Sequence, residues 1–467
     1  MQNYHKHTSF SNVLVTDCTV SYEEYVNRAI ELGQNVISSV EHGYQGNYYI
    51  PYELVQKHND SLYKELEQGE ITEEEYKKKK LKFIFGAEAY WVKDRLLENH
   101  KIDKKTGKGI SGETVKNRTN CHIILLAKNE EGRRDINEIL SIASIDGFYG
   151  QPRIDIDLLL KIKPENVVVT TACLKYWVYE DIEEITEKLH NHFGDNFFLE
   201  IQYHNTSLQK QINQRILKLS KQMGIRLIFG YDSHYIYPNQ YVERDNYLDG
   251  RGIIYDDDEK GWYMDYPDEQ EVRKRLFEQG VLSESEIDEC IKNTDILLDF
   301  EDIILDKKVK LPKNYRFNGE WVGNKSQEWR DETLKNLVYS KWEEQKKNVA
   351  PSMYEEYEKG IAYELDAIIG TKMTDYFLID YETVRIGLEN GGVITKTGRG
   401  SGVSYYVNSL LGFSNIDRFI APVKLYPDRF MSKTRILKTV SLPDLDLNLG
   451  TVEIFAEAQK EVMGEGH

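Results

Sequence analysis

The chain has 467 residues, of which 40% are hydrophobic and 30% charged, a balance that predicts a folded protein of roughly two to four domains. Its formal net charge of −18 argues against broad, non-specific coating of DNA, because phosphate binding usually needs a basic surface. The four cysteines form no Cys-x-x-Cys pair, which argues against a disulfide framework or zinc knuckle and favours a reducing cytoplasm. The sequence shows no secretory signal, and no apolar run approaches the roughly 20 residues that span a bilayer.

Short apolar runs alternate with amphipathic stretches over about the first 240 residues. The runs are predicted to be buried strands: Asn35–Val40, Phe83–Ala87, Cys121–Ala127, Asn166–Thr171, Phe197–Ile201 and Arg226–Phe229. Helices are expected between them, at Tyr22–Leu32, Glu131–Ile142 and Leu208–Met223 among other places. Repeated strand–helix units predict an α/β fold, in which helices surround a parallel sheet or barrel.

Two polar inserts interrupt this pattern, and both are most simply interpreted as plain surface. Residues 61–82 are dense in charge and are predicted to form a solvated helical hairpin, whereas residues 93–120 contain glycines and are predicted to be a mobile loop. We expect each insert to lie outside the core.

The first domain is predicted to span residues 1–305 and the second residues 306–467. The first ends in an acidic, mostly helical stretch, and the boundary is placed at a proline-bearing linker, residues 306–318. Beyond the linker we expect amphipathic helices, a glycine-rich turn within Gly391–Gly402 and a strand-like segment that ends at Asp446.

Polar residues of the first domain occur where the predicted strands end, and in barrel folds the loops at that edge converge. His5 and His7 are two apart, so an extended chain places both on one face. The other candidates are His42, Glu88, His122 (inside a strand), Cys173, Asp232 and His234.

Imidazole, carboxylate and thiolate are the ligands of zinc, manganese or iron, and neighbouring ions can activate water and clamp a phosphate. A single histidine at a strand end is more often a hydrogen-bonded loop residue, and a lone cysteine such as Cys173 is more often a small buried side chain. The paired His-x-His and Asp-x-His, at the same kind of position, favour a metal site.

A second group of residues lies in the other domain. Gly398–Gly402 precedes an apolar segment, Val403–Leu411, predicted to be helical, and backbone N–H groups at such a turn can bind phosphate. Asp444 and Asp446 project from one face of the predicted strand and would hold cations between them, with Leu445 facing the core. Taken singly, a glycine turn is usually a plain loop and Asp-x-Asp is usually surface.

The front half resembles the polymerase-and-histidinol-phosphatase (PHP) family. The matching motifs are His5-Lys6-His7-Thr8-Ser9-Phe10-Ser11, Glu41-His42-Gly43, Gly86-Ala87-Glu88, His122, Cys173 and Asp232-Ser233-His234. The resemblance implies a distorted (β/α)7 barrel and adds Asp17 as a ligand, although its spacing from the first motif is longer here. It also implies two or three zinc or manganese ions and a 3′–5′ exonuclease in preference to a pyrophosphatase. Glu200 and His204 lie in a segment that polymerase members share and are not assigned as ligands.

The back half resembles bacterial or phage C-family replicative DNA polymerases of the DNA polymerase III alpha type. The match includes Tyr363–Ile369, Asp375–Asp380, Thr397–Gly402, Asp428–Phe430 and Val440–Asp446. It departs from the family at Asn448, where the family has an acid, at Leu449, and in extra residues before the aspartates. The resemblance implies an α+β nucleotidyltransferase-like partial palm. Asp444 and Asp446 would hold magnesium, and the incoming nucleotide would be bound by Gly398, Arg399, Gly400, Ser401, Lys396 and Arg429.

Together the two resemblances imply the N-terminal portion of a replicative polymerase, truncated before thumb and fingers and unable to polymerise alone. The expected partners are a DNA primer–template, dNTPs and a second polypeptide with the remaining polymerase domains. A sliding clamp would bind only through missing regions, and no membrane is involved. The alternatives are a stand-alone metallo-phosphoesterase and a non-catalytic subunit of a split polymerase.

Overall fold

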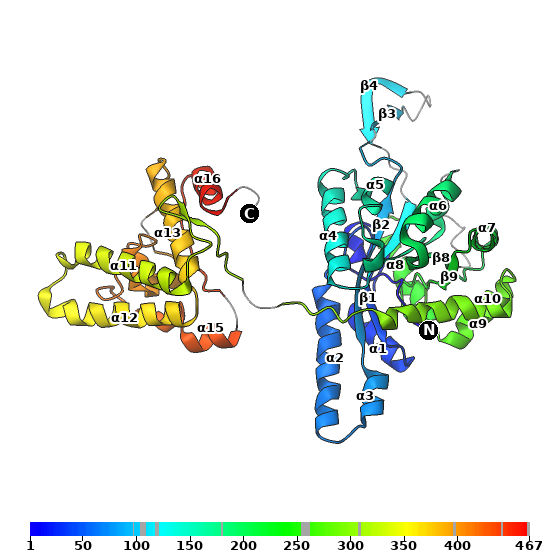
Figure 1. Cartoon of the computed structure of the whole chain (residues 1–467), viewed down its shortest axis with the longest axis horizontal. Helices are drawn as coiled ribbons and strands as arrows, with labels where there is room; N and C mark the ends of the chain where they lie inside the picture. The colour runs from blue at the N-terminus through cyan, green and yellow to red at the C-terminus, as the bar shows by residue number, and fades with distance from the viewer. Residues whose placement is uncertain are drawn as a thin grey trace. The chain divides into compact units, whose positions relative to one another are not determined.

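The computed structural model forms two compact units, Met1–Ile304 (unit 1) and Leu305–His467 (unit 2) (Figure 1). It describes the whole chain except residues 97, 103–108, 117–120, 179–180, 254–261, 307–309, 396–397, 440–441 and 465–467. No helix among the described residues is both long and apolar enough to span a membrane.

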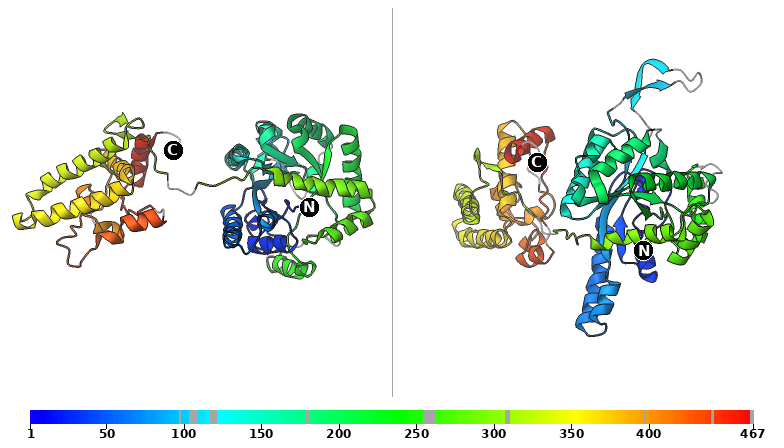
Figure 2. Two further views of the ribbon diagram at one scale, coloured as in Figure 1. Left: turned by 60° about the horizontal axis from the view of Figure 1, so that its bottom comes forward. Right: turned by 45° about the vertical axis from the view of Figure 1, so that its right-hand side comes forward.

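Unit 1 is built on a curled seven-stranded sheet with helices packed around it (Figure 2), which confirms the predicted barrel-like α/β fold. The strand order is β1-β2-β5-β7-β8-β9, and the short β6 pairs with β2. The strands are β1 (Val36–Ser39), β2 (Lys82–Trp91), β5 (Cys121–Ala127), β6 (Arg153–Ile154), β7 (Val167–Thr170), β8 (Phe197–Ile201) and β9 (Arg226–Phe229). These strands lie close to the predicted runs, because each carries the apolar side chains that the core buries.

One strand breaks the parallel pattern. β5 runs antiparallel to both of its neighbours, β2 and β7, whereas β1 and β2 are parallel, as are β7, β8 and β9. The start of β5 therefore lies at the edge where the parallel strands end. The expectation of an all-parallel sheet is wrong at this strand, since hydrophobic runs do not encode strand direction.

The N-terminal segment connects the two ends of the curled sheet. Lys6 forms a parallel bridge with Ser233, just beyond β9, and the backbone N–H of His7 donates to the Ser233 carbonyl at 2.8 Å. On the other side, the Ser38 hydroxyl of β1 donates to the Tyr4 carbonyl at 2.7 Å. Residues 4–7 therefore lie between β9 and β1.

Helices flank this sheet, and several begin at a side-chain cap. Ser21 and Glu24 form a capping box on α1, and Thr206 and Asp268 cap α7 and α9, which satisfies N–H groups of the first turn. The helices are α1 (Tyr22–Glu31), α2 (Tyr49–Glu67), α3 (Glu73–Lys79), α4 (Glu130–Ile145), α5 (Ile156–Leu159), α6 (Ile182–Phe193), α7 (Ser207–Met223), α8 (Tyr241–Gly250), α9 (Glu269–Gln279) and α10 (Glu284–Lys292).

Both inserts differ from the sequence-based expectation. The helical hairpin begins earlier, at Tyr49, because Tyr52 and Val55 of α2 are buried. Within residues 93–120, the predicted mobile loop contains an antiparallel hairpin of β3 (Glu98–Ile102) and β4 (Gly109–Lys116). The two strands are held by backbone hydrogen bonds to each other, and the sequence of either segment alone does not indicate that pairing. Residues 97, 103–108 and 117–120 of the predicted loop lie outside the described residues.

Unit 2 is largely helical. Its elements are β10 (Arg316–Phe317), β11 (Glu320–Trp321), α11 (Gln327–Lys346), α12 (Tyr354–Gly370), α13 (Thr374–Glu389), α14 (Tyr406–Leu410), α15 (Lys433–Thr439) and α16 (Val452–Met463). Trp342, Tyr357 and Phe377 belong to its core, from α11, α12 and α13 respectively.

Two predicted elements of unit 2 are wrong. The apolar segment after the glycine turn is a short 3-10 turn, Ser401–Ser404, followed by the five-residue α14, because the backbone is extended at Tyr405. Residues 442–446 form no strand, and pairing is limited to a bridge between Ile394 and Leu449. Leu445 and Leu447 nevertheless pack on the core. Apolar and acidic side chains therefore alternate between core and solvent as predicted, although the segment joins no sheet.

Candidate metal centre

The side chains that the sequence nominates as metal ligands meet in one buried cluster of unit 1. Groups of three whose donor atoms all lie within 4.8 Å of one another are His7–His42–His234, His5–His7–Asp232, Asp17–Cys18–His234 and His42–Glu88–His122. The remaining nominee, Cys173, joins them, because its Sγ is 3.4 Å from Nδ1 of His122. All nine nominees are thus brought together.

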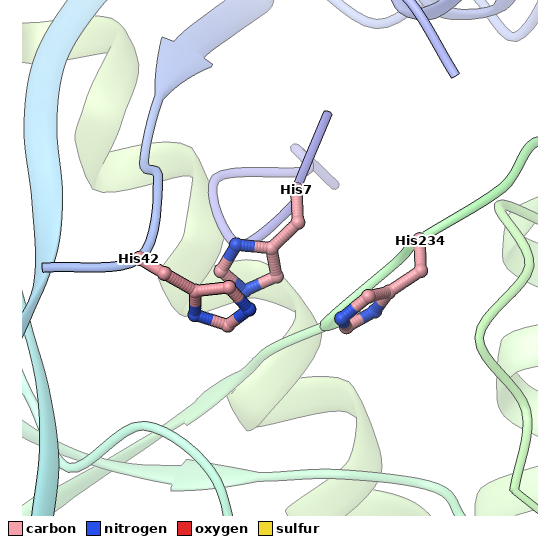
Figure 3. A group of neighbouring side chains, drawn as sticks. All are labelled: His7, His42 and His234. Atoms are coloured by element: carbon pink, nitrogen blue, oxygen red, sulfur yellow. The ribbon is translucent and has the colours of Figure 1, made fainter. Parts of the chain in front are cut away.

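The bridge between Lys6 and Ser233 fixes the direction of the His-x-His pair. Since neighbouring residues of an extended chain face opposite ways, His5 and His7 point to the same side. Their Nε2 atoms each lie 3.2 Å from Oδ1 of Asp232. The ring of His7 stacks on that of His42, with centroids 3.9 Å apart, and tilts toward that of His234 at 4.8 Å (Figure 3).

Glu88 and Asp17 each lie between two histidines. Glu88, from the middle of β2, is 2.5 Å from Nδ1 of His42 and 2.8 Å from Nδ1 of His122. His122 reaches this point from the start of β5 because that strand is antiparallel. Asp17 lies 3.4 Å from Nε2 of His42 and 3.3 Å from Nε2 of His234, so the doubtful assignment from the sequence falls inside the cluster.

Two buried glutamates lie behind the His-x-His pair. Oε1 of Glu200 accepts from Nδ1 of His5 at 2.7 Å, and its other oxygen accepts from the Tyr4 hydroxyl at 2.7 Å. Nδ1 of His7 lies 3.2 Å from the Ser11 hydroxyl, which donates in turn to Glu41. Carboxylates in this position fix the tautomer and orientation of a ligating imidazole.

Glycines provide the space for both glutamates. A Cβ at Gly230 would lie 2.1 Å from the Glu200 carboxyl carbon, and a Cβ at Gly46 would lie 2.6 Å from Cγ of Glu41. Gly46 also has a φ of +63°, a conformation that glycine adopts without strain.

The mutual electrostatics of the cluster hold its acids ionised. Burial opposes ionisation of Glu88 and Asp232, but the adjacent histidines outweigh it and hold the pKa of both well below the ordinary value. Burial lowers the pKa of His7 to about 3, so its ring is neutral and keeps a lone pair. For His42, burial lowers the pKa, but Glu88 and Asp17 outweigh it and raise the pKa to about 10.

The donor set fits metal ions. Among the residues that the structure describes, the buried Nε2 atoms of His5, His7 and His42 have no hydrogen-bond partner, although such atoms are normally satisfied. Nδ1 of His7 faces the Ser11 hydroxyl, which leaves the Nε2 lone pair of the neutral ring directed at the carboxylates. Burial opposes protonation of His5, but Asp232 and Glu200 outweigh it and raise the pKa of His5 well above its ordinary value, so an ion bound there would replace a proton. Imidazole nitrogens beside ionised carboxylates form the ligand set of zinc or manganese, and the side chains do not distinguish between the two.

The second group of candidates, in unit 2, is more open. Asp446 lies against the glycine turn, where a Cβ at Gly400 would be 1.9 Å from its Oδ2, and Nε of Arg399 is 3.8 Å from its Oδ1. Asp444 is exposed, Asp446 is partly exposed, and both act with Asp380 on the buried hydroxyl of Tyr376, whose pKa burial raises.

The other unit 2 candidates are less closely grouped. Arg429 is exposed and Ser401 is half-buried. Gly398 packs near Val403, and Lys396 lies outside the described residues.

Sequence reasoning missed several residues of the two groups. Cys18, which donates to Asp17 at 3.1 Å, is not among the predicted ligands. Glu41 belongs to the motif Glu41-His42-Gly43, but the motif predicts no role for its side chain. Glu200 was noticed but given no role, since its position behind His5 depends on strand pairing between β8 and β9. The available signal was a glutamate inside a buried apolar run, Glu200, together with a glycine directly after the next predicted strand, Gly230.

Two families of known proteins match separate segments of the chain. Residues 3–204 match the family model of the PHP domain, and residues 332–463 match that of the bacterial DNA polymerase III alpha NTPase domain. Most residues of the buried cluster lie in the segment that is similar to the PHP domain, whereas Asp232 and His234 follow it.

The curated relatives are DNA polymerase III alpha subunits. That of Borreliella burgdorferi is 28% identical over 80% of this chain and 30% of its own length, and that of Aquifex aeolicus is 25% identical over 95% and 36%. The protein of Treponema pallidum is 25% identical over 95% and 34%. The chain spans about a third of the length of these relatives and is similar to them over most of its own length.

Proposed function

We propose that unit 1 is a metal-dependent phosphoesterase that removes nucleotides from the 3′ end of DNA. The observation that carries the proposal is the set of buried Nε2 atoms on His5, His7 and His42, which have no hydrogen-bond partner in the described part of the chain and lie among ionised carboxylates. His5, His7, Asp17, His42, Glu88, His122, Cys173, Asp232 and His234 would hold two or three zinc or manganese ions. Bound ions of this kind activate a water and neutralise charge on a phosphoryl group.

The chain's own residues would hold this arrangement in place. Glu200 orients His5, and Glu41 orients His7 through the Ser11 hydroxyl. Since the ring of His7 is neutral and Asp232 is ionised, neither would need to change its protonation state before it binds an ion.

We further propose that unit 2 forms part of the nucleotidyl-transfer site of a replicative DNA polymerase, with primer–template and dNTPs as substrates. Asp444 and Asp446 would hold magnesium, and Gly398–Ser401 with Arg399, Lys396 and Arg429 would bind the triphosphate. The contact of Asp446 with Gly400 supports this assignment, because it puts a carboxylate against the turn. The remaining polymerase domains, and any clamp, would belong to the other two thirds of the relatives' length or to a partner chain.

The exonuclease is tested on the whole chain with a single-stranded oligonucleotide labelled at its 5′ end. With Mn²⁺ or Zn²⁺, we expect stepwise shortening from the 3′ end. His7→Ala and Asp232→Ala should abolish it, whereas Asp444→Ala, in the other unit, should leave it unchanged. Absence of shortening with every metal, or full activity of Asp232→Ala, contradicts the proposal.

The role of unit 2 is tested separately. We expect Mn²⁺ with a dNTP to raise the unfolding temperature of unit 2, and Asp446→Asn to remove most of that increase. An equal increase in wild type and variant would show that the nucleotide binds elsewhere.

A further inference from the structure

Three alternate residues, Glu200 in β8 and Gln202 and His204 just beyond it, line one side of the metal centre. Oε1 of Glu200 contacts His5 at 2.7 Å, and Nε2 of Gln202 lies 3.4 Å from Oδ2 of Asp232. His204 is the third: Gln279 donates to the backbone carbonyls of both Gln202 and His204, and the charge of Asp232 acts on the His204 ring. Carbonyls two residues apart that share one donor lie on the same side of the backbone, and alternate side chains then do so as well, so His204 lies on the same side as Gln202, toward Asp232.

The proton position on His204 is opposite to that on the ligand histidines. The backbone N–H of Tyr263 donates to Nδ1 of His204 at 3.1 Å, so in the neutral ring the hydrogen is on Nε2. Burial lowers the pKa of His204 to about 4, an effect that Asp232 offsets only in part, so the ring is neutral near pH 7. His204 therefore offers an N–H donor and not a metal-binding lone pair.

This donor is buried and unused. His204 is 1% exposed, and its Nε2 makes no hydrogen bond among the described residues. The ring is held firmly, since Trp262 stacks on it at 5.0 Å with an interplanar angle of 18°, and Gln279 donates to the His204 carbonyl at 3.0 Å. A buried polar N–H without a partner implies a partner supplied by the ligand, and a fixed donor is suited to charge that a reaction develops.

We propose that Nε2–H of His204 donates a hydrogen bond to a non-bridging phosphoryl oxygen of the substrate at the metal centre. The inference rests on the proposed phosphoesterase function of unit 1 and adds a substrate contact to it. His204 acts as a neutral donor, so the role requires no change in its protonation.

The test compares His204→Ala with His204→Gln in the whole chain. A glutamine can place an N–H donor near the position of Nε2, whereas alanine removes the donor. His190→Ala, a partly buried histidine of α6, is the matched control. Mn²⁺ affinity, inorganic phosphate affinity of the Mn²⁺-loaded protein, and kcat/KM on the oligonucleotide are measured for each.

We expect Mn²⁺ affinity to stay within about 2-fold in all variants, because His204 is not a ligand. Phosphate affinity should fall roughly 10-fold and kcat/KM roughly 10- to 100-fold in His204→Ala, with partial recovery in His204→Gln. A loss of Mn²⁺ binding in His204→Ala, or phosphate affinity equal to wild type, overturns the inference, as does a wild type that binds no phosphate.

The two proposals can fail separately. If the wild type cleaves no DNA but His204→Ala still weakens phosphate binding, the exonuclease proposal fails and the role of His204 stands. If the wild type cleaves DNA and His204→Ala does so equally well, the role of His204 is refuted and the exonuclease remains.

Discussion

The carboxylates of the two candidate sites differ in how deeply they are buried. In unit 1, Glu88 and Asp232 are buried and each contacts more than one histidine, and their positions are set by β2 and by the end of β9, which the core holds in place. In unit 2, Asp444 is exposed and Asp446 partly exposed, on a segment without regular secondary structure. The carboxylates of the first site are enclosed by packed side chains, whereas those of the second are open to solvent. Burial among complementary groups distinguishes them.

The sites nevertheless share one device, a glycine that leaves space for an acid. Gly230 makes room for Glu200 in unit 1, and Gly400 makes room for Asp446 in unit 2. The consequence of filling that space depends on whether the acid can move away, which is the clearest way to test the contrast.

Metal removal should separate the units most strongly. Ions that bind only folded unit 1 stabilise it by about 2.7 kcal/mol at 100 times their dissociation constant. We therefore expect a chelator to lower the unfolding temperature of unit 1 by several degrees and leave that of unit 2 unchanged. Calorimetry of both transitions, with Asp232→Ala as the variant that should not respond, checks this. Equal shifts in the two transitions would contradict it.

Alanine at the two glycines should have unequal effects. Gly230→Ala forces its Cβ into the buried Glu200 carboxylate, so we expect a loss of about 2–3 kcal/mol in unit 1 and weaker metal binding. Gly400→Ala should cost only about 1 kcal/mol, mostly from its φ of +65°, because Asp446 can swing into solvent.

Denaturant unfolding measures both variants. Gly250→Ala is the control, because a Cβ there meets no atom within 4 Å. A loss at Gly400 equal to that at Gly230 would refute the contrast between a fixed acid and a movable one.

Within unit 1, the two histidines of the first motif should depend unequally on their partners. Glu200→Gln keeps an acceptor for His5 but removes its charge, and we expect Mn²⁺ affinity to fall about 10-fold. Ser11→Ala interrupts only the indirect path from Glu41 to His7, so a fall of about 2- to 3-fold is expected. Calorimetric titration of the metal-free chain measures both, and an unchanged affinity in Glu200→Gln would exclude a positioning role.

The smallest effect concerns pH and unit 2. Burial raises the pKa of Asp380 to about 7, whereas an unfolded aspartate titrates near about 3.9. The stability that protonated Asp380 contributes is therefore complete below about pH 4 and is lost as the pH rises through 7. We expect Asp380→Asn to stabilise unit 2 by on the order of 1 kcal/mol at pH 8 and not at pH 4.

Unfolding temperatures of wild type and Asp380→Asn between pH 4 and 8 measure this difference. The depressed pKa values of Glu88 and Asp232 give the metal-free unit 1 the opposite trend, because stability from those acids is lost as the pH falls. A wild-type unit 2 with the same pH profile as the variant would mean that Asp380 stays ionised.

The sequence by itself determined most strands of the unit 1 sheet, the nine candidate ligands and the two resemblances. Strand positions such as Phe197–Ile201 follow from local apolar runs, and strand-end polar residues follow from the same pattern. Motif spacing was enough to nominate His5, His7 and Asp232, because their chemistry is unusual for loop residues.

Only the tertiary structure decided the direction of each strand and which side chains lie buried beside one another. The reversal of β5, which brings His122 to the edge shared with Glu88, depends on which strands pair, and no local pattern encodes that choice. The places of Glu200 and Gly230 depend on the register between β8 and β9. The segment ending at Asp446 lacked a partner strand and stayed irregular, since a strand needs hydrogen bonds from a neighbour that sequence propensity cannot supply.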